Sequence, residues 1–118
     1  MKQLQQFATP LLVAVALQTG FTTDDTRAAI TQASETHGIS AGFLDCIVFK
    51  ESTYRPWAVG MQGEQGAVQI HPRSSMMSRF YNQGYTSVWD PFQAVDFLAV
   101  SILDGLGRHW TGYRACIA

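Results

Sequence analysis

The carboxyl group of Glu51 is the side chain in this sequence whose setting most favours catalysis. Ile47 and Val48 precede it by four and three residues, which places Glu51 on the apolar face of a helix that we expect to begin after Ser40. Partial burial and the negative end of the helix dipole both penalise the anion and raise the pKa of the carboxyl. A carboxyl that stays protonated near neutral pH can serve as a general acid. The alternative is an ordinary Glu at the solvated end of a helix.

A second pattern follows the Glu51-Ser52 pair after a loop rich in glycine. Residues 63–69 read G-x-x-G-x-x-Q, and Pro72 follows them. A Glu-Ser pair and this motif, in this order, resemble the soluble lytic transglycosylase branch of the lysozyme-like superfamily. The resemblance runs from about Asp24 to the C-terminus.

That resemblance implies a fold and a reaction. The fold is mainly α (α+β lysozyme-like), with helices around a substrate cleft and at most a small β-hairpin, over residues 21–118. In this family the matching Glu protonates the β-1,4 glycosidic oxygen between N-acetylmuramic acid and N-acetylglucosamine in peptidoglycan. The substrate's 2-acetamido group then stabilises the anomeric carbon. The Glu finally deprotonates the C6 hydroxyl, which closes a 1,6-anhydro ring, a departure from the two-carboxylate pattern. Glu51 would fill both roles.

Three residues match the family's substrate site. Ser52 follows the catalytic Glu, where its hydroxyl either orients the carboxyl or caps the helix end. Gln69 stands at the end of the family's G-L-M-Q motif, and its amide suits a sugar acetamido or hydroxyl group. Gly66 matches the motif's Gly, where a missing Cβ lets the backbone approach the ligand. Ala67 and Val68 replace the usual Leu and Met.

Aromatic side chains could supply flat faces for sugar rings, although aromatics are as often part of a core. Tyr54, Trp57 and Trp89 are candidates, and so are Trp110 and Tyr113 in the final segment. The family usually carries an A-Y-N motif in that final segment, and this sequence lacks it. We expect Trp110 or Tyr113 to take its place as a substrate contact.

Glu64 supports a rival interpretation. It lies in the loop where hydrolytic relatives place a second carboxylate, which would activate water and make the protein a lysozyme with Glu51 as acid. The alternative is a solvated loop residue. A third interpretation, from a different class, is a module that binds glycan without cleaving it.

Asp45 and Asp96 lie within expected helices and are interpreted as structural.

Two features concern export. Cys46 and Cys116 fit an export route and would form a disulfide, although two buried thiols remain the alternative. Residues 1–20 carry one Lys and a short apolar run, too short to span a bilayer, which predicts a signal peptide; the alternative is an N-terminal helix packed on the domain. We therefore expect a periplasmic or secreted protein, or one carried in a phage virion.

The composition limits the partners. The chain has 118 residues, 47% hydrophobic and 14% charged, which indicates one globular domain, and its net charge of −1 argues against a broad nucleic-acid interface. Three His without metal-ligand spacing give no reason to expect a metal or other cofactor. We expect a monomer that binds peptidoglycan glycan strands. The resemblance implies, as a further partner, a phage particle or a secretion or conjugation apparatus.

The remaining elements follow from caps and breakers. Helices are expected from about Asp24 to His37, with Gly38 as the stop, and over residues 74–81. Asp90 is predicted to cap the last long helix, with Gln93 completing a capping box. The apolar stripe of that helix comprises Ala94, Val95, Leu98, Ile102 and Leu106. Between the helices we expect irregular loop with at most a small hairpin, in which residues 59–62 could pair weakly with 67–70.

Overall fold

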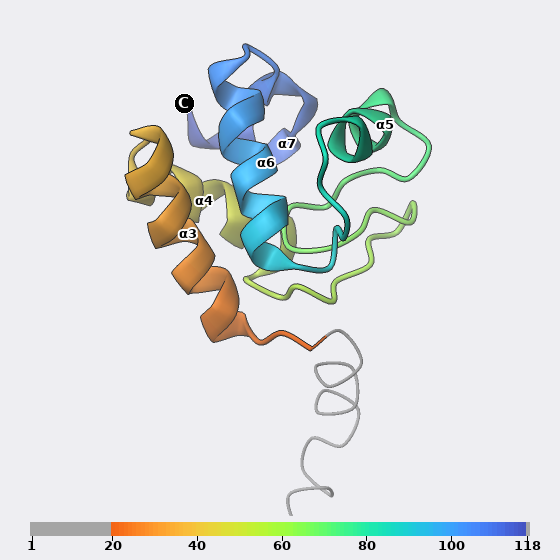
Figure 1. Cartoon of the computed structure of the whole chain (residues 1–118), viewed down its shortest axis with the longest axis horizontal. Coiled ribbons are helices and arrows are strands. Elements are labelled where there is room, and N and C mark those ends of the chain that lie inside the picture. Colours follow the sequence, from red (N-terminus) through yellow and green to blue (C-terminus); the bar gives the residue numbers. More distant parts are fainter. Residues whose placement is uncertain (1–19, 118) are drawn as a thin grey trace, which may run out of the picture.

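The computed structural model describes residues 20–117, and its regular structure is helical (Figure 1). The elements in chain order are α3 (Thr23–His37), α4 (Ala41–Ser52), α5 (Ser75–Asn82), α6 (Pro91–Leu103), the 3-10 helix η1 (Gly107–His109) and α7 (Thr111–Cys116). The prediction of a mainly α fold is confirmed. The predicted signal peptide, residues 1–20, lies outside the described residues except for Gly20. Within 20–117, no helix combines the length and the apolar character needed to cross a membrane.

The first two helices begin and end where capping residues predict. The Thr22 hydroxyl accepts a hydrogen bond from the Asp25 amide, and the Asp25 carboxylate accepts one from the Thr22 amide, so a capping box starts α3. Gly38 ends α3 in the left-handed region, with φ +70°. Ser40 caps α4 by accepting a hydrogen bond from the Phe43 amide.

The start of α6 differs from the prediction in one detail. Asp90 caps the helix by accepting a hydrogen bond from the Phe92 amide, as expected. The capping box with Gln93 is wrong, because the Asp90 amide already donates to the Ser87 carbonyl. The Gln93 side chain instead donates to the Asp90 carboxylate and accepts from the Thr86 amide at 2.6 Å. Gln93 therefore fastens the preceding loop to the helix.

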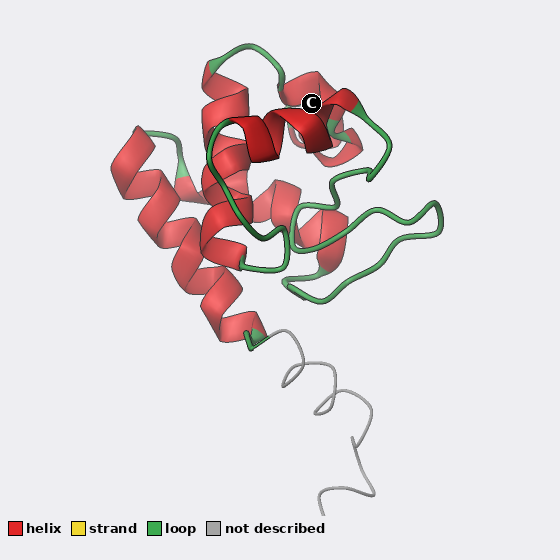
Figure 2. Cartoon of the chain, turned by 45° about the vertical axis from the view of Figure 1, so that its right-hand side comes forward, coloured by secondary structure: helices red, strands yellow, loops and turns green. Residues whose placement is uncertain are grey.

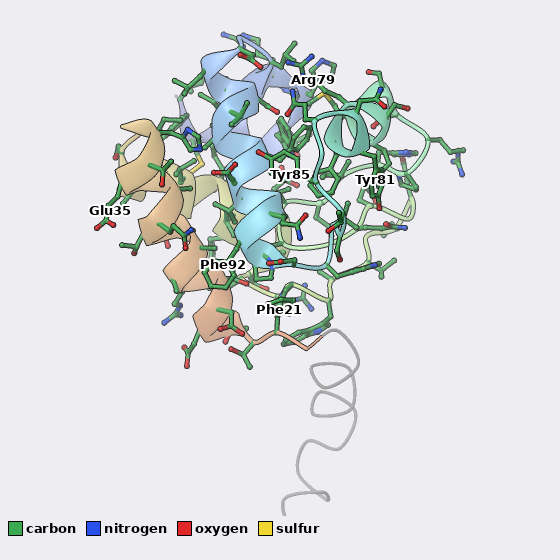
Figure 3. All side chains as sticks on the ribbon, viewed as in Figure 1. Phe21, Glu35, Arg79, Tyr81, Tyr85 and Phe92 are labelled. Carbon is green, nitrogen blue, oxygen red and sulfur yellow. A yellow bond between two sulfur atoms is a disulfide. The ribbon has the colours of Figure 1, made fainter. Side chains whose placement is uncertain are left out.

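The core forms where α6 packs between its neighbours. Figure 1 shows α6 between α3 and α5, and most of its length is buried. The ring of Phe21, just before α3, packs edge-on against Phe92 at the start of α6, with centroids 6.4 Å apart (Figure 3). Leu106 lies beyond the helix, which ends at Leu103, so its place in the predicted stripe is wrong. The buried core includes Ile30, Leu44, Ile47, Val48, Phe80, Val95, Phe97 and Leu98.

The chain between α4 and α5 is loop, and Figure 2 shows it (green) extending beside the helices. Isolated antiparallel bridges join Gln65 to Val59 on one side and to Ile70 on the other. The predicted pairing of 59–62 with 67–70 is therefore wrong, because Gln65 lies between the two segments and bridges to both. This loop forms one wall of the cleft described below.

Candidate active site

A cleft of about 190 Å³ lies where the end of α4, the loop before α5 and the start of α7 meet. It brings together four residues that the sequence singled out, namely Glu51, Glu64, Gln69 and Trp110. The residues that line it are Glu51, Glu64, Gln69, Ile70, His71, Ser74, Met76, His109, Trp110 and Thr111.

Glu51 stands in the last turn of α4 and is held from the opposite side by α7. The backbone N–H of Gly112 donates to Oε2 of Glu51 at 2.8 Å, and the hydroxyl of Thr111 lies 3.5 Å from the same oxygen. Burial raises the pKa of the Glu51 carboxyl, and the nearby charge of Glu64 adds to the rise. The hydrogen bond from Gly112 acts in the opposite direction. A raised pKa is the property expected of a general acid.

Glu64 faces the same cleft in a different electrostatic setting. The Gln62 amide donates to its Oε1 at 2.9 Å. Hydrogen bonds from the backbone amides of Glu64 itself and of Gln62 lower the pKa of this carboxyl, and His71 contributes in the same direction. The cleft therefore holds two carboxyl groups whose pKa values are displaced in opposite directions, as in sites that divide acid and base roles between two carboxyls.

Gln69 organises the wall of the cleft. Its Nε2 donates to the carbonyl oxygens of Ala58 and Gly66, at 3.1 and 3.0 Å. A Cβ on Gly60 would lie 2.4 Å from Oε1 of Glu64 and 2.6 Å from Oε1 of Gln69. Gly60 thus gives both side chains room to turn toward the cleft.

The missing Cβ of Gly66 serves the fold rather than a ligand. Gly66 is buried, its φ is +84°, and a Cβ there would lie 2.3 Å from the carbonyl oxygen of Val88. The segment before α6 therefore passes directly over Gly66, and the interpretation of Gly66 as a point of ligand approach is corrected.

The Ser52 hydroxyl does not bond to the Glu51 carboxyl. Its buried hydroxyl donates to the carbonyl oxygen of Val48 at 3.3 Å, within α4. Of the two roles left open for Ser52, this bond matches the one at the helix end.

The candidate aromatics separate into different regions. Trp110 is buried and lines the cleft, and its Nε1 donates to the Val68 carbonyl at 2.8 Å. Tyr113 is half-buried outside the cleft lining and packs edge-on against Phe43, with centroids 5.5 Å apart. Trp57 is also half-buried and outside that lining.

Tyr54 lies in another groove, with Arg27 and Asp45. Its hydroxyl donates to the Asp45 carboxylate at 3.0 Å, and the Arg27 guanidinium lies 4.6 Å from the ring centroid. Thr53 and Tyr54 both have positive φ, so the chain turns sharply after α4 and carries the ring away from the cleft.

Several cleft residues were missed by sequence reasoning. His71 and His109 were considered only as metal ligands, and the spacing excluded that role; within residues 20–117 no cluster of three metal-binding side chains is found. Nδ1 of His71 accepts a hydrogen bond from the Arg73 amide at 3.2 Å, which leaves Nε2 as the donor in the neutral ring. No sequence pattern pointed to Thr111 or Gly112 as neighbours of Glu51. Gly112 contributes only its backbone amide, a donor that every residue except proline possesses.

The two cysteines form a disulfide between α4 and α7, which confirms the predicted Cys46–Cys116 pair and excludes two free thiols.

Comparisons with family models, with curated proteins and with solved structures found no match to this chain.

Proposed function

We propose that this protein is a peptidoglycan lytic transglycosylase with Glu51 as its general acid and base. The observation that carries the proposal is the Glu51 carboxyl itself. It faces a cleft, its pKa is raised by burial, and a backbone amide fixes its orientation. A carboxyl with a raised pKa and a fixed orientation at the edge of a cleft is the arrangement that favours protonation of a glycosidic oxygen.

In the proposed reaction, Glu51 protonates the oxygen between N-acetylmuramic acid and N-acetylglucosamine. The 2-acetamido group of the substrate attacks the anomeric carbon as the leaving sugar departs. The Glu51 carboxylate then takes the proton from the C6 hydroxyl of the N-acetylmuramic acid. The C6 oxygen attacks the anomeric carbon and displaces the acetamido oxygen, which restores the acetamide and closes the 1,6-anhydro ring. Glu51 ends the cycle protonated, so the step uses no water and no cofactor.

The cleft residues suit a neutral, hydroxyl-rich ligand. Ser74, His71 and His109 offer polar groups, and Trp110 and Met76 offer apolar surface. A substrate in the cell wall accords with the predicted signal peptide and the disulfide, both of which suit export or delivery in a phage particle. A domain of this size suits local opening of the wall for a phage particle or a secretion or conjugation apparatus.

A hydrolytic lysozyme is the second candidate, because Glu64 faces the same cleft and its pKa is lowered. A carboxylate with a lowered pKa in the same cleft as a carboxyl with a raised pKa could activate water, which would leave a reducing end in place of the anhydro ring.

Mass spectrometry of the products from purified peptidoglycan tests both candidates. Muropeptides with 1,6-anhydro ends, lighter by one water than hydrolytic products, are expected from the wild type and from Glu64→Gln, and none from Glu51→Gln. Products with reducing ends from the wild type, absent from Glu64→Gln, would refute the transglycosylase and support the hydrolytic lysozyme. Activity that survives in Glu51→Gln would refute both, and binding to sacculi without any product would indicate a glycan-binding module.

A further inference from the structure

Helix α7 is joined to α4 at two points. Cys116, the last residue of α7, is bonded to Cys46 in α4, and the Gly112 amide near the start of α7 donates to Oε2 of Glu51 in α4. The two attachments lie at opposite ends of α7, so together they fix both its position and its direction against the helix that carries Glu51.

The approach of α7 to α4 depends on Gly112. This residue is buried, and a Cβ there would lie 2.9 Å from Oε2 of Glu51 and 3.1 Å from the carbonyl oxygen of Ile47. Any other residue would hold the two helices further apart or displace the carboxyl. A glycine within a helix lowers its intrinsic stability, and a helix of six residues has little stability of its own. Attachments outside the helix must therefore keep α7 in place.

The contact also decides which oxygen of Glu51 carries the proton. Oε2 accepts the hydrogen bond from Gly112 and lies within reach of the Thr111 hydroxyl, whereas Oε1 has no hydrogen-bond partner in the described part of the chain. An oxygen that accepts an N–H bond acts as the carbonyl oxygen of the neutral acid. In the protonated form of Glu51 the proton is therefore expected on Oε1, the atom free to meet a substrate.

We propose that Gly112 is a positioning residue for the general acid and that the Cys46–Cys116 disulfide keeps it in contact with Glu51. This inference rests on the proposed glycosidic cleavage. Reduction of the disulfide releases the end of α7, and the carboxyl loses the bond that sets its orientation. Misplacement of a catalytic group by about 1 Å lowers the rate roughly 100-fold, so we expect kcat to fall 10- to 100-fold. KM changes less than kcat, because only the α7 side of the cleft, with Thr111, is released and the loop wall keeps its contacts.

The test compares the oxidised wild type, the wild type under reductant and the Gly112→Ala variant, with turnover measured on soluble glycan strands. The chain has two cysteines, so a reductant acts at this one disulfide. Gly42→Ala is the matched control, because Gly42 lies in α4 and its added Cβ would meet only the Ser40 hydroxyl, at 3.7 Å. Hydrogen exchange of the Gly112 amide, followed by NMR, reports the positioning contact without any substrate.

The inference predicts that reduction and Gly112→Ala both lower kcat with KM within about twofold, while Gly42→Ala matches the wild type. It also predicts faster exchange of the Gly112 amide in the reduced, still folded protein. Unchanged kcat and unchanged exchange after reduction would overturn it. If the oxidised wild type cleaves no glycan, the proposed function fails, and the exchange measurement alone decides whether the disulfide holds Gly112 against Glu51. If reduction unfolds the chain, Gly112→Ala decides, since that variant retains the disulfide.

Discussion

Replacement of Gly66 by alanine should be far more damaging than the same change at Gly63, although both glycines have a left-handed backbone. Their φ values are +84° and +88°. An alanine in this region costs about 1 kcal/mol at either site. The two sites differ in what the new Cβ would meet. At Gly63 the nearest atom is Cγ of Pro72 at 3.6 Å, an ordinary contact, whereas at Gly66 it is the backbone oxygen of Val88 at 2.3 Å.

The oxygen of Val88 belongs to the backbone, so a side-chain rotation cannot relieve this overlap. The two segments must separate by about 1 Å to restore van der Waals contact, and overpacking of this kind costs about 1 to 3 kcal/mol. We therefore expect Gly66→Ala to lower the free energy of unfolding by about 3 kcal/mol, and Gly63→Ala by about 1 kcal/mol.

Urea unfolding at pH 7, followed by tryptophan fluorescence, measures both variants against the wild type. A loss of about 3 kcal/mol moves the urea midpoint of Gly66→Ala by 1 M or more, with Gly63→Ala between it and the wild type. Gly66→Ala should also lower turnover, because the Gly66 carbonyl accepts one of the two hydrogen bonds that hold the Gln69 side chain in the wall of the cleft. Equal midpoints for the two variants would refute the close approach of Val88 as the reason for glycine at this position.

Three further predictions concern single side chains. The raised pKa of Glu51 means that the folded state binds this proton more tightly than the unfolded chain, so stability falls as pH rises from the unfolded value of 4.5 through the folded value. Glu51→Gln should thus unfold at a higher temperature than the wild type at pH 7, with the gain disappearing in melting curves below pH 4.5; a constant gain would contradict the linkage. Trp110→Phe leaves the buried Val68 carbonyl without its donor and should cost about 2 to 3 kcal/mol in urea unfolding, whereas a loss below 1 kcal/mol would show that water replaces the indole. Tyr85→Phe removes a hydrogen bond to the Asp96 carboxylate and should cost about 2 kcal/mol, with turnover unchanged because neither residue lines the cleft; reduced turnover would show that this pair also supports the site.

The helix boundaries could be predicted because capping chemistry is local. Ser40 and Asp90 each bond to an amide two or three residues away, so a short stretch of sequence contains both partners. The same reasoning failed for Gln93. Its side-chain amide oxygen accepts a hydrogen bond from Thr86, in a loop that only the folded chain brings near the start of α6.

The partial burial of Glu51 could be predicted for a similar reason, whereas the groups around its carboxyl could not. Glu51 owes its burial to its own helix face, which the spacing of Ile47 and Val48 defines. Its orienting donor is a backbone amide on a helix 61 residues away, and backbone donors leave no mark on sequence. Tyr54 was a candidate because an aromatic ring can pack on a sugar ring, but it lies at the second of two successive residues with positive φ, and its hydroxyl bonds to Asp45 outside the cleft.

The disulfide also has a topological consequence. It closes a covalent ring over the chain from Cys46 to Cys116, with a sequence separation of 70 residues, and every residue that lines the cleft falls inside that ring. A single peptide-bond cut within the ring would open it without releasing a fragment, so a nicked molecule would keep all of its cleft residues on one covalent unit. Helix α3 lies outside the ring, and it is held against α6 by packing and by the contact between His37 Nε2 and Asp96 Oδ1 at 2.6 Å.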